Sequence, residues 1–355
     1  MVEWLAGNRI RGTSTERTTT AGIGNTVGGW VEVGRTTLGS ANASITVSSL
    51  PDKRYYKYLL GGGTKSANFD TVIRLNGDSN PNYANRYTYN DTLNSNTGST
   101  GGYIYVTGNA STTPDFSVGY LANLATKEKL GMSWACRGMT AGAGYEPQRS
   151  ECVFKHVQTT NPISSITATS TSASTFGIGA ELVVLGWDES DTHTDNFWEP
   201  LGSTTLATAG DNIEVTFTAK KYLMVKLYRK PTGSADARWT FNNDGGANYA
   251  KRKSSDGSTD STSEGLNQNY FTQYTYDNSE PSYSSTIIVN TAGAEKLGIQ
   301  HEMNRRVAPA SNAPHRSESV FKWANTSDQI TTIDITNSKS GSYDVGSIIE
   351  VWGHD

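Results

Sequence analysis

The sequence predicts an all-β protein made of two tandem antiparallel β-sandwich domains with jelly-roll-like topology, preceded by an extended N-terminal arm. Short runs that alternate polar and apolar residues, such as 43–50 and 211–218, are typical of half-buried strands. Clusters of Gly, Asn, Asp, Ser and Pro separate these runs, as turns between strands require. The chain also repeats itself once, which indicates two copies of one unit.

The composition fits a folded protein that is poor in charge. Of 355 residues, 35% are hydrophobic and 18% are charged, and the net charge is −4. This is not the high-charge profile of a disordered chain. No lysine–arginine stripe is present, and no apolar run approaches the ~20 residues that span a bilayer. We therefore expect neither nucleic-acid binding nor membrane insertion.

The repeat sets the predicted domain boundaries. "PQRSECVFK" at 147–155 returns as "PHRSESVFK" at 314–322, and "EKLG" at 128–131 returns at 295–298, each 167 positions later. The unit is too long for a solenoid repeat, so each copy is expected to be a domain. The predicted parts are an N-terminal arm at 1–27, a first sandwich at 28–189, a joint at 190–196 and a second sandwich at 197–355.

Along both copies the local patterns favour strands. Helical periodicity is weak, and its best candidate is 121–131, which covers one to three turns. Runs rich in β-branched and aromatic residues predict further strands at 181–187, 221–228, 285–290 and 347–352.

The N-terminal arm is polar and glycine-rich, with a few large apolar side chains. Trp4, Leu5 and Ile10 are the candidates for docking it, either onto its own domain or onto a neighbouring subunit. The opening residues lack the basic and apolar segments of a secretory signal. We therefore expect synthesis in a cytoplasm without export by that route.

An asparagine-rich turn occurs once in each copy. Asn and Asp side chains close turns on their own backbone, so a structural turn with a tyrosine anchor is the favoured interpretation. The alternatives are a sugar-binding cluster and a calcium site at Asn76, Asp78 and Asn82, although a single carboxylate provides little charge for calcium. The repeated residues are Asn76, Asp78, Asn82, Tyr83 and Arg86 in the first copy and Asn242, Asp244, Asn248, Tyr249 and Arg252 in the second.

A second repeated motif places an arginine and a glutamate on one face of a strand. Arg149 and Glu151 have the counterparts Arg316 and Glu318. Structural ion pairs are the favoured interpretation, because a shared fold suffices to retain them. A catalytic glutamate is the alternative.

The two copies differ most in two long segments, 90–115 and 254–282. Loops at the ends of a sandwich often carry recognition, and Tyr with Ser, Gly and Asn forms adaptable binding surfaces. Strand tyrosines beside a solvated hairpin are an equally good interpretation. The candidate ligand-binding residues are Tyr103, Tyr105, Tyr270, Tyr274 and Tyr276.

Nothing in the sequence predicts catalysis or a cofactor. No histidine recurs between the copies, and no phosphate-binding loop, dinucleotide motif or metal-binding histidine pair is present. Two carboxylates would suffice for a glycosidase, so a glycan hydrolase or lyase stays open. Cys136 and Cys152 are expected to be lone buried thiols, and a single disulfide between them is the alternative.

The opening "EWLAGNRIRGTSTERT", the following "GWVEVGRTTLGS" and the Gly/Ser/Thr-rich β domains resemble structural proteins of marine tailed phages and related environmental viruses. The resemblance implies a virion part, such as a capsid, head-decoration, fibre or spike protein. It implies no catalytic residues.

We therefore expect a non-enzymatic virion protein that self-associates through its arm and its sandwich faces, with cyclic symmetry. Its expected partners are itself, other virion proteins and a host surface glycan. The alternative is a carbohydrate-binding or adhesin module that uses the tyrosine-rich loops.

Overall fold

A computed structural model describes residues 29–96, 102–107, 113–188, 191, 196–262, 266–273, 279–305 and 312–355. The N-terminal arm, with Trp4, Leu5 and Ile10, lies outside the described residues, as do Tyr274 and Tyr276. Regular structure in the described part is β-strand, and every strand pairing is antiparallel. The described residues contain no helix of the length and apolarity needed to cross a membrane.

The first half of the chain is a sandwich of two sheets. Its large sheet has the strand order β1-β12-β3-β8-β9-β10-β5-β6, and its small sheet has the order β2-β11-β4-β7. The strands are β1 Val31–Thr37, β2 Ser44–Val47, β3 Tyr55–Gly61, β4 Thr71–Leu75, β5 Tyr83–Tyr89, β6 Thr92–Asn96, β7 Ile104–Thr107, β8 Asp115–Ala122, β9 Lys129–Arg137, β10 Gln148–His156, β11 Ile166–Ser170 and β12 Glu181–Trp187.

The second half is a sandwich of the same design. Its large sheet has the order β13-β23-β15-β19-β20-β21-β17, and its small sheet has the order β14-β22-β16-β18. The strands are β13 Glu199–Thr205, β14 Asn212–Thr216, β15 Tyr222–Arg229, β16 Ala237–Phe241, β17 Tyr249–Ser255, β18 Phe271–Gln273, β19 Ser282–Val289, β20 Lys296–Asn304, β21 His315–Trp323, β22 Thr332–Thr336 and β23 Ile348–His354.

In the described residues the two halves share strand order and register. The second half has no named strand that matches β6, but Ser261 forms an isolated antiparallel bridge with Lys253 of β17, as β6 pairs with β5. Cys152 pairs with Ser133, and 167 positions later Ser319 pairs with Gln300. Even a β-bulge recurs, since the register of the first strand shifts between Glu32 and Gly34, and that of β13 between Pro200 and Gly202. This correspondence is what a duplication of one unit predicts.

The helix considered at 121–131 is wrong. This segment contains the end of β8, a turn and the beginning of β9. Thr126 adopts a positive φ of 57° within the turn, which ends any helical geometry. Asn123 stabilises the turn, because its side-chain amide donates to the Lys53 carbonyl at 2.9 Å.

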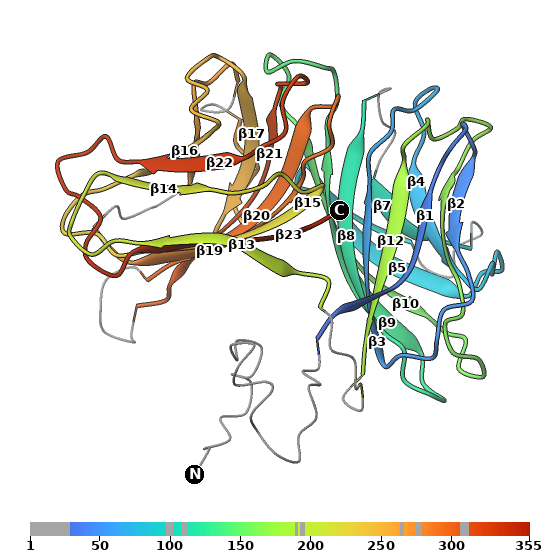
Figure 1. Cartoon of the computed structure of the whole chain (residues 1–355). Helices are drawn as coiled ribbons and strands as arrows, with labels where there is room; N and C mark the ends of the chain where they lie inside the picture. Colours follow the sequence, from blue (N-terminus) through green and yellow to red (C-terminus); the bar gives the residue numbers. More distant parts are fainter. Residues whose placement is uncertain are drawn as a thin grey trace, which may run out of the picture.

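Three hydrophobic cores stabilise the part of the chain that the structure describes. One fills each sandwich, as strand alternation requires. The third lies between the outer faces of the two large sheets and contains Leu59, Phe116 and Val320. Figure 1 shows the large sheets meeting at the junction of the two halves, where β8 and β9 contact β20. The buried side chains of β3 and β12 alternate between two cores, because these strands are covered on both faces.

Candidate functional site: a wedge between the two sandwiches

The two large sheets touch closely at one end of their contact and diverge at the other. On β9, Cys136 is fully buried, Trp134 is half-buried and Met132 is 45% exposed. On β20, Ile299 is buried, whereas Met303 is 43% exposed. These residues alternate along the outer faces of their strands, so each step along the strand leads from the closed contact to solvent.

Trp134 and His301 form the corner at which the sheets separate. Their rings meet edge to face with centroids 5.2 Å apart. Burial lowers the pKa of His301. The two residues occupy equivalent positions in the two copies, 167 residues apart. The corner is therefore formed by the same position of each copy.

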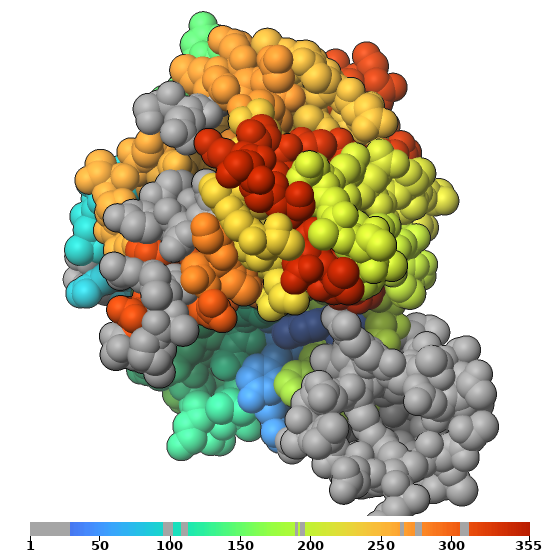
Figure 2. Space-filling view, turned by 90° about the vertical axis from the view of Figure 1, so that its left-hand side faces the viewer, coloured from blue at the N-terminus to red at the C-terminus, as the bar shows by residue number. Residues whose placement is uncertain are grey.

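An apolar wall leads away from each side of this corner. Register aligns Met132 with Val153 on one wall, and Tyr228, Tyr283 and Met303 on the other. We call the two walls and their corner the wedge. The walls hold half of the twelve large hydrophobic side chains that are exposed in the described part of the chain: Leu130, Met132, Val153, Tyr228, Tyr283 and Met303. Figure 2 looks toward this side and shows the blue and blue-green residues of the first sandwich beneath the second.

A buried lysine lies at one end of the corner. The Lys57 ammonium is 5.1 Å from the centroid of the Tyr120 ring and 5.2 Å from that of Trp198, which belongs to the second sandwich. Burial, and to a lesser degree the nearby Lys226, lowers the pKa of Lys57 to about 7. The aromatic faces provide the attraction that a buried cation needs.

The other end of the corner holds the repeated Arg–Glu motif. Arg149 pairs with Glu151 at 2.7 Å, and Arg316 pairs with Glu318 at 3.0 Å. Arg149 also reaches Asp260 of the second sandwich at 2.7 Å. Burial raises the pKa of Glu318. The first arginine therefore links the two sandwiches, which the sequence did not predict.

The repeated turn has the same structural role in both copies. Asn76 and Asn242 adopt positive φ values of 55° and 52°. Each side-chain oxygen accepts hydrogen bonds from backbone N–H groups just before the neighbouring strand of the small sheet, β11 or β22. These include the N–H groups of Ser164 at 2.7 Å and Thr331 at 2.8 Å. Asparagine tolerates this left-handed geometry and stabilises it by such bonds.

The aspartate of the turn can pair with either of two side chains at equivalent positions, which are His156 in the first copy and Trp323 in the second. Asp78 bonds to Nε2 of His156 at 2.9 Å, and Asp244 accepts a hydrogen bond from Nε1 of Trp323 at 2.7 Å. Burial alone raises the pKa of Asp78, but hydrogen bonds from groups including Asn82 and His156 outweigh it and lower the value to about 2. Among the described residues no cluster of three or more His, Cys, Asp or Glu side chains could hold a metal.

The tyrosine anchors also recur, whereas the two arginines differ. The hydroxyl of Tyr83 donates to the Asp78 carbonyl at 3.1 Å, and that of Tyr249 donates to the Asp244 carbonyl at 3.0 Å. Arg86 is exposed on the outer face of β5. Arg252 instead donates to the Pro147 carbonyl at 2.9 Å and so contacts the other sandwich.

The predicted ligand-binding tyrosines are not equivalent. Tyr105 lies within β7, is 9% exposed and stacks on Tyr87 with ring centroids 4.0 Å apart, so it is a core residue and not a loop residue. Tyr103 is half-buried. Tyr270 is half-buried beneath the Arg238 guanidinium, which lies 4.5 Å from its ring centroid.

Both cysteines are free thiols. Cys136 points into the core between the sandwiches, and Cys152 points into the core of the first sandwich. Because they lie on opposite faces of one sheet, a disulfide between them is excluded. Burial raises the pKa of Cys152 to about 12 and that of Cys136 further, so neither thiol is poised for reaction.

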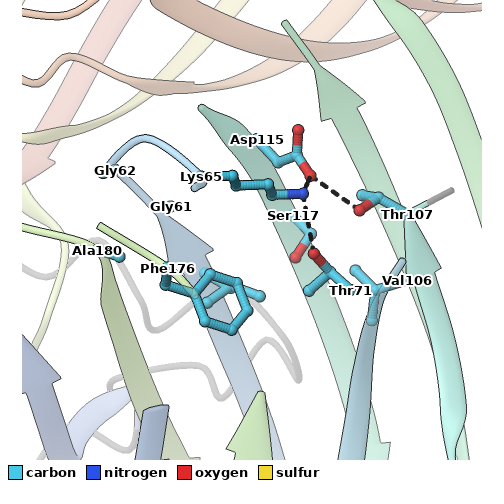
Figure 3. A pocket seen from close by; sticks show the side chains of 12 residues that line it. Gly61, Gly62, Lys65, Thr71, Val106, Thr107, Asp115, Ser117, Phe176 and Ala180 are labelled. Carbon is cyan, nitrogen blue, oxygen red and sulfur yellow. Dashed lines mark hydrogen bonds and ion pairs between the residues drawn. The ribbon is translucent and has the colours of Figure 1, made fainter. Parts of the chain in front are cut away.

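A small cavity lies within the first sandwich. Its volume is about 20 Å³, roughly room for one water molecule. Figure 3 shows Lys65 reaching Asp115 and Thr71, while Asp115 also accepts from Thr107 at 2.8 Å. Lys65 approaches from the loop after β3, and its ion pair with Asp115 lines the cavity.

The second sandwich fills the corresponding place with a different cation. Gly62, on the rim of the cavity, corresponds to Arg229, which is buried and donates to Ser282 at 3.2 Å. Ser282 in turn corresponds to Asp115. The cavity is therefore a packing difference between the copies, and the wedge is the stronger candidate for a functional surface.

Comparisons with known proteins identify no family. No family model and no curated protein matches the chain. Domains LG4-5 of the mouse laminin α1 chain are similar over 92% of this chain and 90% of theirs, with 10% identity and a TM-score of 0.20. The mavirus major capsid protein is similar over 99% of this chain and 92% of its own, with 8% identity and a TM-score of 0.14. At these TM-scores the likeness carries no argument about function.

Proposed function

We propose that this chain is a non-enzymatic structural protein of a virion, which self-associates through its sandwich faces and its N-terminal arm. The exposed apolar walls of the wedge are the observation that supports the proposal most directly. Contiguous apolar surface of this kind marks protein–protein contact sites. The viral setting rests on the resemblance of the opening segments, and the proposed partners are further copies and other virion proteins.

The ionisable groups near the wedge support a role without catalysis. Glu151 and Glu318, the strongest candidates for a catalytic carboxylate, each pair with an arginine on the same strand. The proposed protein therefore presents surfaces and performs no reaction.

Molar mass in solution tests the proposal. Light scattering of the full chain from about 1 μM to about 1 mM should show an oligomer whose share rises with concentration, and Met132→Glu with Met303→Glu should reduce it to a monomer, because charge on the walls opposes apolar contact. Ile178→Glu is the control, since Ile178 is 70% exposed but lies outside the wedge. A monomer across the whole range would contradict self-association.

A carbohydrate-binding role is the second candidate. The half-buried rings of Tyr120, Trp134 and Trp198 around the corner are suited to stacking on sugars. A monomer that binds a glycan array, and loses binding on Trp134→Ala, would favour this function over the first.

A further inference from the structure

We propose that the wedge is the seat of the chain's own N-terminal arm, residues 1–28. Binding of the arm to the wedge does not depend on the viral role. If copies exchanged their arms, the arms would link subunits, and this consequence alone rests on the proposed function.

The first argument is the place where the arm begins. Trp30, next to the first described residue, contacts Tyr120 with ring centroids 5.9 Å apart, and its ring lies 6.4 Å from that of Trp187. Tyr120 is the cross-strand partner of Met132, and Met132 is the partner of Val153. The arm therefore leaves the body at one end of a continuous apolar row that crosses β8, β9 and β10.

The second argument is reach. Neighbouring strands lie about 4.8 Å apart, so the row from Tyr120 to Val153 is only about 10 Å long. The chain between position 5 and Trp30 can extend to roughly 80 Å. A tethered segment of this kind has an effective concentration on the order of millimolar near the row. At micromolar protein concentration the chain's own arm is therefore favoured over that of a second copy.

The third argument is chemical fit. The arm carries Trp4, Leu5 and Ile10 within seven positions, separated by small and polar residues. The walls offer Leu130, Met132 and Val153 at 45–54% exposure, and Tyr283 and Met303 at 40–43%. Large apolar side chains that cover these residues remove both surfaces from water.

Disulfide trapping tests the seat. In the double variant Leu5→Cys, Met132→Cys, air oxidation at about 1 μM should form a bridge within one chain. It should form about tenfold faster than in the control Leu5→Cys, Ile178→Cys. Ile178 is 70% exposed and lies beyond the other end of β12 from Trp187, within reach of an unseated arm. The native thiols are buried and should react slowly with either engineered one.

Equal rates in the two variants would overturn the proposal. A disulfide between two chains would also overturn the proposal, because the wedge would then bind a neighbour's arm. That result would favour the proposed assembly. A single-chain bridge in a protein that stays monomeric at all concentrations would support the seat and contradict the proposed function, so the two failures are distinguishable.

Methionine oxidation gives a second measurement on native side chains. Removing residues 1–28 should speed peroxide oxidation of Met132 and Met303 several-fold, because oxidation follows exposure. Met139, which lies beyond β9 on the far side of the closed contact, should oxidise at an unchanged rate. Unchanged rates at Met132 and Met303 would overturn the proposal.

Discussion

At the scale of single residues, the two copies bury different ionisable groups. Glu302 replaces Ala135 at the equivalent position and points into the second sandwich. Gln273 donates to one of its oxygens at 2.9 Å, and the other oxygen is buried without a hydrogen bond in the described part of the chain. Burial raises the pKa of Glu302 to about 8, although Gln273, Lys251 and Arg229 act in the opposite direction.

This carboxyl makes stability depend on pH. Between its ordinary pKa near 4.5 and the native value, the folded chain keeps the proton that the unfolded chain releases, so stability falls as pH rises. Glu302→Gln, which mimics the protonated form, should therefore become more stable than the native chain from pH 5 to 8, by up to about 1.4 kcal/mol per pH unit. Urea unfolding at several pH values measures the stability difference between the variant and the native chain. The exposed Glu199→Gln should show no such trend, and a pH-independent difference for Glu302→Gln would contradict the assignment.

At the scale of elements, the period-two patterns and the repeat predicted most strands and their equivalence. The pattern failed at 121–131, where a turn with spaced apolar residues imitates a short helix. For Tyr105 the sequence left a binding loop and a strand tyrosine equally open, and the structure places the residue in the buried strand β7. The wedge could not be predicted, because it depends on how two sheets cross. Within the strand predicted at 181–187, the apolar run 182–185 is typical of burial on two faces.

The recurring bulge gives a test at this scale. Gly34 and Gly202 follow the bulge in their strands. A Cβ at Gly34 would overlap Cγ1 of Val47, whereas at Gly202 the nearest atom, Cγ2 of Val215, lies 3.0 Å away. Gly34→Ala should cost about 1–3 kcal/mol through overpacking, and Gly202→Ala less than about 1 kcal/mol. Denaturant titration of both variants measures these losses of stability. Equal losses would show that β2 moves to accommodate the methyl group at Gly34.

At the scale of the whole molecule, one residue position experiences two environments. Val153 on β10 and Val320 on β21 are equivalent, but Val153 is 54% exposed on the wedge and Val320 is 1% exposed in the core between the sandwiches. The copies therefore contact each other asymmetrically, and this asymmetry leaves one wall of the wedge open.

The core between the sandwiches should make the chain unfold as one unit. Its buried side chains come from both halves, including Phe116 and Tyr222, so neither sandwich loses its partner without exposing apolar surface. Calorimetry of the native chain should show a single transition.

Val320→Asp buries an unpaired carboxylate, which costs several kcal/mol, and should separate the transition into two while the inner cores persist. Ile178→Asp adds the same charge at a side chain that is 70% exposed and lies outside the wedge, where the change should stay within about 0.5 kcal/mol and leave a single transition. Two transitions in the native chain would mean that the contact between the sandwiches is too weak to couple them, and the wedge would then lack a fixed geometry.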